Sequence, residues 1–237
     1  MKKPAFFLAA LCSGTLLLGS CNSDKSADST ATTTETTSTD ATASGDMAGM
    51  NHDAPAANGD SPMMAAMNDM MAKMHAMKPK GNTDHDFAHH MMEHHRGAVA
   101  MADIELRDGK DATLRQMAKK IKADQQREIA EMEPIAERLD AAPTNYKPQD
   151  PSDPFTSQMK ASMDGMMQNM PKATGNVDQD FVGMMIPHHQ SAVDMAKAEV
   201  AHGKDTKLKE MAQKMIDAQQ QEIQQFKDWQ TKNGTQQ

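Results

Sequence analysis

Two pairs of adjacent histidines, each set among methionines, are the residues of this sequence best suited to holding a metal ion. The pairs are His94 with His95 and His188 with His189, and a methionine stands three positions before each pair. Neutral imidazole is the commonest metal-binding side chain. Thioether sulfur favours Cu(I), or Ag(I) as its analogue, over zinc, iron, magnesium or calcium. The pattern therefore favours the binding of a soft metal ion.

Both pairs belong to a unit that occurs twice in the chain. Residues 84–129 align with residues 178–223 at a constant offset of 94, with 22 identities in 46 positions and no gap. Upstream of each unit, a set of methionines recurs at an offset of 96. One exchange within the repeat is informative, because His90 stands where the second unit has Met184, and both side chains ligate copper.

Helical spacing runs through both units. Within residues 87–105 one set of residues recurs at alternating steps of four and three, which places it on one face of a helix. Asp84 can cap the start of this helix, Gly109 can follow its end and Asp111 can cap the next helix, which Pro134 should end or kink. The sequence therefore predicts an all-α fold, a four-helix bundle built from two helical hairpins, with the Met-rich segments adding short helices.

Polar side chains occupy positions on the predicted helix seams. A turn near residues 109–110 places His94 level with Gln125 and Met91 level with Glu128, and the second unit repeats the arrangement. His94 and His188 should face the bundle interior, with the second histidine of each pair flanking it. Buried polar groups are costly without partners. These polar residues therefore either fix the helix register through mutual hydrogen bonds or hold a metal in the bundle core.

The methionines favour the second alternative, a metal site in the bundle core. Those upstream of each unit fall on one helical face where leucine, isoleucine and phenylalanine are scarce, and flexible methionine alone specifies a core poorly. Exchanges such as Ile121 for Met215 indicate that some methionines only pack. The candidate ligands of these stripes are Met67, Met70, Met71 and Met74 in the first unit and Met163, Met166, Met167 and Met170 in the second.

The N-terminus carries the features of an export signal. Two lysines precede the apolar residues 5–18, and the sequence that ends at Cys21 resembles a bacterial lipobox, so we expect removal of residues 1–20 and lipidation of Cys21. Residues 21–61 then form a Ser/Thr-rich, disordered tether. We therefore expect the protein to be anchored in the bacterial cell envelope and to face the periplasm or the extracellular side. The tether adds three candidate copper ligands, Met47, Met50 and His52.

Charge and composition argue against several classes of function. Asp and Glu total 33 against 25 Lys and Arg, the net charge is −8, and aromatic residues make up 3%. This composition lacks the basic, aromatic surface of a nucleic-acid binder. The sequence also has no phosphate-binding loop, nucleophile elbow, Cys-x-x-Cys pair or dinucleotide fingerprint, so we expect a binding protein and not an enzyme.

The segment from Phe181 to Ala196 resembles the signature of the CopM-like family, through its Met-x-x-His-His-x-x-Ala-x-x-Met-Ala core. The resemblance covers roughly residues 62–230 and implies a ferritin-like helical bundle, copper binding outside the cytoplasm and copper tolerance. The first unit departs from the signature by Met92-Glu93 and by three additional histidines, His85, His89 and His90. The ligands that the resemblance implies are Met91, His94, His95 and Met101 in the first unit and Met185, His188, His189 and Met195 in the second.

We therefore expect two units, residues 62–140 and 155–237, joined by a Pro-rich linker at residues 141–154 and sequestering Cu(I). The expected partners are copper ions, the membrane through the lipid anchor, and a protein that exchanges copper. Two alternatives stay open. One is a lipid-anchored structural or partner-binding bundle without metal. The other is a ferritin-like di-iron protein, for which Glu199 and His202 fit but the matching Glu105 and Asp108 do not.

Overall fold

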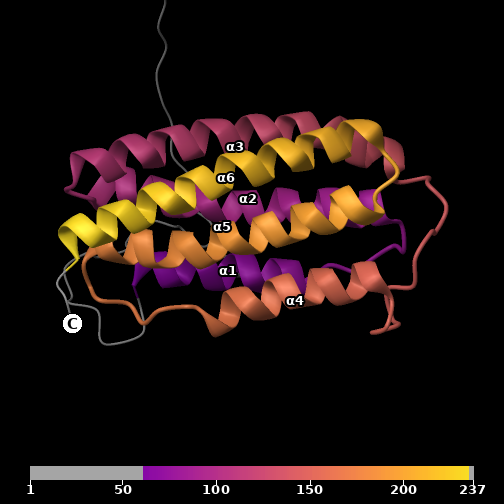
Figure 1. Ribbon diagram of the computed structural model, residues 1–237, viewed down its shortest axis with the longest axis horizontal. Coiled ribbons are helices and arrows are strands. Elements are labelled where there is room, and N and C mark those ends of the chain that lie inside the picture. Colours follow the sequence, from indigo (N-terminus) through magenta and orange to yellow (C-terminus); the bar gives the residue numbers. More distant parts are fainter. Residues whose placement is uncertain (1–60, 235–237) are drawn as a thin grey trace, which may run out of the picture. The chain divides into compact units, whose positions relative to one another are not determined.

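The computed structural model describes residues 61–234, which form six helices, and the longest connection, residues 140–153, joins α3 to α4 (Figure 1). Within this range there is no β-strand, which confirms the predicted all-α class. Nor does any helix between residues 61 and 234 combine the length and apolar character needed to cross a bilayer. The helices are α1 (Pro62–Ala76), α2 (Thr83–Asp108), α3 (Ala112–Leu139), α4 (Pro154–Gln168), α5 (Val177–His202) and α6 (Thr206–Asn233).

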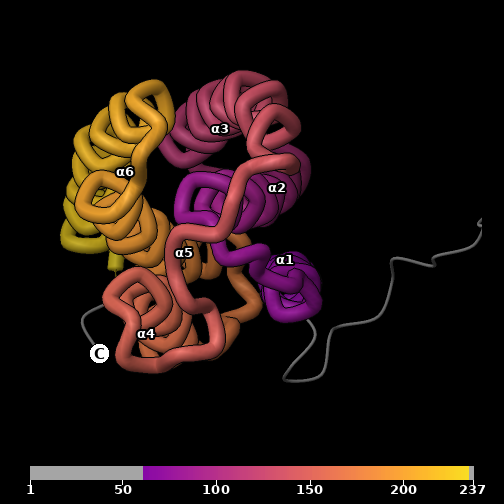
Figure 2. The backbone as a smooth tube through the Cα atoms, turned by 90° about the vertical axis from the view of Figure 1, so that its right-hand side faces the viewer, coloured from indigo at the N-terminus to yellow at the C-terminus, as the bar shows by residue number. Residues whose placement is uncertain are grey.

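The six helices lie in three layers. α2 and α5 pack against each other in the middle layer, α3 and α6 cover one side, and α1 and α4 cover the other (Figure 2). The expected hairpins, α2 with α3 and α5 with α6, meet through α2 and α5. α3 and α6 do not pack closely against each other. A groove runs between them, and the ion pair of Lys120 with Glu222 at 2.9 Å joins its two sides. The predicted bundle is therefore open along one side.

Local capping explains where the long helices begin. α3 starts at the expected cap, because the Asp111 carboxylate accepts a hydrogen bond from the Leu114 amide at 2.9 Å. α2 starts two residues earlier than predicted. Its cap is Asn82, whose side-chain oxygen accepts a hydrogen bond from the His85 amide at 3.1 Å, which leaves Asp84 free for another role.

Asp84 links the two repeats. Its side chain is buried, and Oδ1 accepts hydrogen bonds from the backbone amides of Lys204 at 2.7 Å and Asp205 at 2.6 Å, in the turn of the other hairpin. Its counterpart Asp178 accepts hydrogen bonds from both amides of residues 110–111 at 2.9 Å. Each repeat thus satisfies backbone donors at the turn of the other, which helps to hold the two hairpins together.

A glycine follows the first helix of each hairpin, and close packing rather than a left-handed backbone requires it. Gly109 follows α2 with φ of −66°, which is not the left-handed region. A Cβ at this position would lie 2.2 Å from Glu105 Oε1, and one at Gly203 would lie 2.1 Å from Glu199 Oε1. Glycine is required here because the buried carboxyl of the preceding turn folds closely over the backbone.

The Met-rich helices α1 and α4 are not equivalent. α1 approaches α2 closely at Gly97, where a Cβ would lie 2.4 Å from the sulfur of Met70. The second repeat has Ser191 at that position, and a hollow of about 530 Å³ between α4 and α5 is lined by Ser191 and Met166. The missing side chain at Gly97 therefore lets Met70 of α1 lie directly against α2.

α3 does not end at Pro134, as the sequence allowed, but continues through it to Leu139. Pro134 lies on the exposed face of the helix, and so does Ala130, whose carbonyl loses its helical partner. Because water can reach that carbonyl, the proline costs less here than it would in the core. The linker after α3 folds back onto α2, with the Asn82 side chain donating to the Pro143 carbonyl at 2.8 Å.

Candidate metal centre

A layer of four histidines lies at the centre of the molecule, where α2 packs against α5. We call His94, His95, His188 and His189 the histidine layer, and none of the four has exposed surface. The rings of His94 and His188 face each other with centroids 3.7 Å apart and planes tilted by 36°. His188 Nε2 donates a hydrogen bond to the His94 carbonyl at 3.1 Å. The two equivalent positions therefore meet at the interface of the repeats, as expected for residues facing the interior.

The other two histidines flank this pair and are held by carboxylates. His95 Nε2 lies 2.8 Å from Glu128 Oε2 on α3, and His189 Nε2 lies 3.0 Å from Glu222 Oε2 on α6. Because an ionised carboxylate only accepts hydrogen bonds, Nε2 carries the proton and Nδ1 of a neutral ring keeps its lone pair. A carboxylate behind the distal ring nitrogen is the usual support of a histidine that ligates a metal.

These pairs correct the predicted register. Glu128 was expected level with Met91, but it bonds His95, one helical turn along α2. Side chains on a helix lean toward its N-terminus. Since α2 and α3 are antiparallel, the side chains of His95 and Glu128 lean toward each other, which counting residues from the turn does not capture.

Burial sets the protonation state of the two central histidines. Loss of solvation, followed by the neighbouring histidines, holds the pKa of His94 and of His188 well below 6.5. Burial opposes ionisation of Glu222, but hydrogen bonds from His189 and Lys120 outweigh it and keep the pKa of Glu222 below its usual value. Neutral imidazole and ionised carboxylate are the forms that metal binding requires.

Several polar atoms in the histidine layer and beside it lack a hydrogen-bond partner among the described residues. They are both ring nitrogens of His94 and the Nδ1 atoms of the other three histidines, together with side-chain atoms of Gln125 and Gln219. Buried polar atoms are nearly always partnered in proteins. A concentration of unpartnered nitrogens in one buried layer therefore points to a partner from outside the chain.

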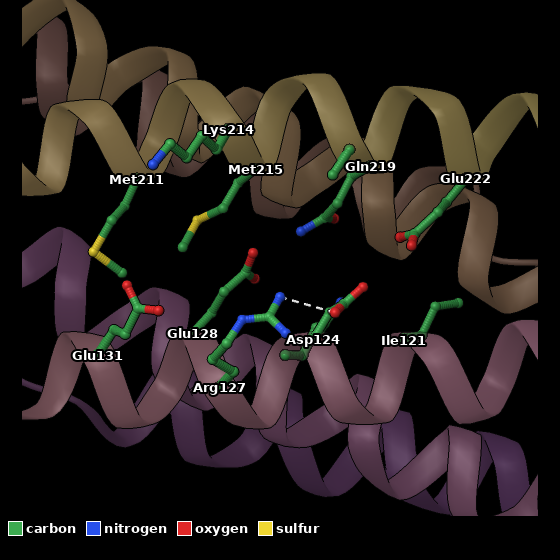
Figure 3. A pocket seen from close by; sticks show the side chains of 12 residues that line it. Ile121, Asp124, Arg127, Glu128, Glu131, Met211, Lys214, Met215, Gln219 and Glu222 are labelled. Atoms are coloured by element: carbon green, nitrogen blue, oxygen red, sulfur yellow. Dashed lines mark hydrogen bonds and ion pairs between the residues drawn. The ribbon is translucent and has the colours of Figure 1, made fainter. Parts of the chain in front are cut away.

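Figure 3 shows the groove between α3 and α6. It forms a cavity of about 290 Å³, and the two carboxylates that bond the flanking histidines, Glu128 and Glu222, line it. Its further lining includes Asp124 and Glu131 from α3 and Met211 and Met215 from α6. The groove contains four carboxylates, those of Asp124, Glu128, Glu131 and Glu222, and two basic side chains, Arg127 and Lys214. Its net negative charge favours the approach of cations.

Most of the predicted methionine ligands are buried in the same core. Met91 and Met185 lie one helical turn before the histidine pairs and are fully buried, and this spacing places each on the helical face of its histidines. The other buried candidates are Met67, Met70, Met71, Met74, Met101, Met166, Met184 and Met195. Met163 and Met170 are only partly buried and Met167 is 51% exposed, so the methionines upstream of the second unit are less buried than those of the first.

The remaining predicted residues lie apart from the layer. His90 is partly buried, and its Nδ1 donates to the Asp86 carbonyl at 2.8 Å. Glu199 and His202 of the di-iron alternative lie near the end of α5, where Glu199 is eleven residues and thus about 16 Å along the helix from His188. The four predicted residues Cys21, Met47, Met50 and His52 lie outside the described residues.

Sequence reasoning missed one further group of candidate ligands. The side chains of His85, His89 and Asp140 bring potential ligating atoms within 4.8 Å of one another. The two histidines were visible as additions to the first unit. Asp140 is 55 positions from His85, and no spacing pattern in the sequence connects them.

Comparison with known families identifies the repeated unit. The family described as "Domain of unknown function (DUF305)" matches residues 19–136 and, in a second match, residues 84–230. The chain belongs to the DUF305 family. The first match contains His94 with His95, and the second contains both histidine pairs of the layer. The segment from Phe181 to Ala196, which carries the CopM-like signature, lies within the second match. The family expected from the sequence is therefore confirmed.

Solved structures similar to this chain include several of CopM. CopM in the Cu(I)-bound form is 28% identical, with a TM-score of 0.49 over 64% of this chain and 98% of that chain. CopM in the Ag-bound form, obtained by soaking, has the same identity and score over 97% of that chain. For the Cu(II)-bound form the identity is 29% and the TM-score 0.48. No curated protein matches the chain.

Proposed function

We propose that this protein binds Cu(I), with Ag(I) as its analogue, in the histidine layer and the adjoining thioethers of Met91 and Met185, and that it sequesters copper. The observation that carries the proposal is the set of unpartnered ring nitrogens in a fully buried layer. A layer that served only to fix helix register would satisfy its own hydrogen bonds. Here hydrogen bonds to Glu128 and Glu222 orient two of the rings, while their Nδ1 atoms stay without a partner.

The donor types select the metal. Neutral imidazole with thioether suits Cu(I), and the surrounding core excludes water. A di-iron site would draw glutamates from four helices, whereas the carboxylates that bond this layer within residues 61–234 are Glu128 and Glu222. The buried methionines of α1, all within one face, extend the soft donor set beyond the layer. We therefore propose a capacity above one Cu(I) per chain.

The proposed setting is the cell envelope, where the lipidated Cys21 would anchor the protein and the bundle would contribute to copper tolerance. Thioethers suit this compartment, since they form no disulfides and stay uncharged at any pH. A copper-exchanging protein would reach the layer through the acidic groove.

An anaerobic competition titration of the full chain against a chromophoric Cu(I) chelator tests the proposal. We expect more than one Cu(I) to be withdrawn from the chelator, and an excess of Zn(II) to leave that number unchanged, because zinc binds thioethers poorly. A chain that withdraws no Cu(I), or that loses it to Zn(II), would overturn the proposal.

A further inference from the structure

A second set of metal-binding side chains lies outside the histidine layer, where α2 begins and α3 ends. His85 and His89 are one helical turn apart on α2, and Asp140 caps the C-terminus of α3. His85 Nε2 lies 3.1 Å and His89 Nε2 3.9 Å from Asp140 Oδ1, and the two rings have centroids 4.3 Å apart. Two ligands about 2 Å from a tetrahedral metal lie roughly 3.3 Å apart. The exposed Asp140 side chain therefore needs only a small movement to share an ion with the two rings.

A buried carboxylate orients His85 toward this point. His85 Nδ1 lies 2.8 Å from Asp86 Oδ1, which directs Nε2 to Asp140. Asp86 is itself fixed by the Tyr146 hydroxyl at 2.6 Å and by the amides of Lys80 and Gly81 at 2.9 and 2.8 Å. A carboxylate that holds the far nitrogen of a histidine is the support found behind metal-ligating histidines.

His89 provides an independent observation. Its Nε2 is buried and has no hydrogen-bond partner among the described residues, although an ionisable oxygen of Asp140 lies 3.9 Å away. Both ring nitrogens of His85 already face carboxylates, those of Asp86 and Asp140. A network that existed only for structure gives no reason for a second imidazole aimed at the same oxygen.

The second repeat shows that the fold does not require these side chains. The positions equivalent to His85, His89 and Asp140 are Gln179, Gly183 and Gly234. These three residues line a hollow of about 480 Å³ at the corresponding place. The same backbone therefore forms without any of the three ligands.

We propose that His85, His89 and Asp140 bind one divalent transition cation of the borderline class, Zn(II) or Cu(II), separately from the Cu(I) of the histidine layer. Two imidazoles and a carboxylate suit these ions, whereas thioethers suit Cu(I). The C-terminus of α3 adds the partial negative charge of its last carbonyls. Water completes the coordination, since the Asp140 side chain is 65% exposed.

Calorimetric titration with Zn(II) tests the site on the full chain, both metal-free and after loading with Cu(I). We expect one Zn(II) per chain in both forms. His89→Ala should bind it at least about tenfold more weakly and keep its full Cu(I) count. The variant should fold, because the His89 ring nitrogen that it removes makes no hydrogen bond. His75→Ala is the matched control, since His75 is an exposed histidine on α1, and it should keep the Zn(II).

His85→Gln, which introduces the residue of the second repeat, should weaken Zn(II) binding as His89→Ala does. Equal Zn(II) affinity in the wild type and both variants would overturn the proposal, as would a folded wild-type chain that takes up no Zn(II). Failure of the Cu(I) proposal is a separate result, because the Zn(II) titration of the metal-free chain does not depend on it.

Discussion

His94 and His188 occupy the same position in the two repeats, and their rings meet at the α2–α5 interface with centroids 3.7 Å apart. Both rings are fully buried, and their pKa values lie well below 6.5 because burial disfavours the charged form. Two neutral rings are thus held together with three of their four nitrogens lacking a hydrogen-bond partner among the described residues. Either a metal ion or an unusual structural contact accounts for this arrangement, and the two differ in their consequences.

Replacing both central histidines separates the two accounts. The double variant His94→Ala/His188→Ala should lose Cu(I) relative to the wild type in the chelator titration. It should also lose about 3 kcal/mol or more of unfolding free energy, because two buried rings are truncated. Urea unfolding of the metal-free protein measures the second effect. A variant that is destabilised yet keeps its full Cu(I) count would show that the central pair is structural.

The stability of the metal-free protein should fall as the pH rises from about 7 to about 9. Burial, followed by the charge of Asp84, raises the pKa of Glu199 from 4.5 to about 9, and burial with Asp178 raises that of Glu105 to about 8. Between 4.5 and these values the folded state keeps a proton that the unfolded state has released. Below about 6.5 the unfolded state protonates the two histidines that stay neutral in the fold, His94 and His188, and this opposes the effect of the glutamates. The unfolding free energy therefore decreases with pH above about 7 and levels off above about 9.

Glu199→Gln should remove part of this pH dependence. The amide cannot ionise, so the variant should gain stability relative to the wild type as the pH rises, by on the order of 1 kcal/mol per pH unit. Urea midpoints measured from pH 5 to pH 9 give the comparison. The exposed Glu210→Gln is the control and should follow the wild-type curve. Parallel curves for wild type and Glu199→Gln would contradict the assigned protonation.

The contact between the repeats predicts a large effect at Asp84. Asp84→Ala leaves the amides of Lys204 and Asp205 without their acceptor, which should cost about 2–3 kcal/mol. It also removes the charge beside Glu199, so the pH dependence of stability should become shallower. Thermal unfolding at several pH values checks both effects. Asp103→Ala, at an exposed site on the same helix, should change stability by about 0.5 kcal/mol or less.

The close packing of α1 depends on Gly97. Gly97→Ala would place a Cβ 2.4 Å from the Met70 sulfur and 3.0 Å from its Cβ, so α1 must move away from α2. We expect a loss of about 1–3 kcal/mol. Gly165→Ala on α4 is the opposite case, with nothing within 4 Å of the added Cβ, and should stabilise its helix by up to about 1 kcal/mol. Urea unfolding that ranks the two variants the other way would refute this account of the packing.

The sequence predicted the helices and the hairpins because period and capping are local properties. The repeat with Phe87 and Phe181 at equivalent positions, and the cap at Asp111, needed only neighbouring residues. The bond from Glu128 to His95 was missed, since it depends on the direction in which side chains lean from two antiparallel helices.

Long-range contacts were beyond prediction for a physical reason. Asp84 satisfies amides 120 and 121 positions away, and Asp140 meets His85 only after α3 has folded back along α2. Nothing in the local pattern near these residues encodes such partners. The meeting of His94 and His188 was predicted, because each of them lies on the helical stripe of its repeat.

X-ray absorption at the copper edge of the chain loaded with one equivalent of Cu(I) tests the central claim most directly. We expect both nitrogen and sulfur in the first coordination shell, from the histidine layer and its methionines, and a loss of nitrogen in His94→Ala/His188→Ala. A shell with sulfur alone, or a spectrum that the double variant leaves unchanged, would contradict the assignment of Cu(I) to this layer.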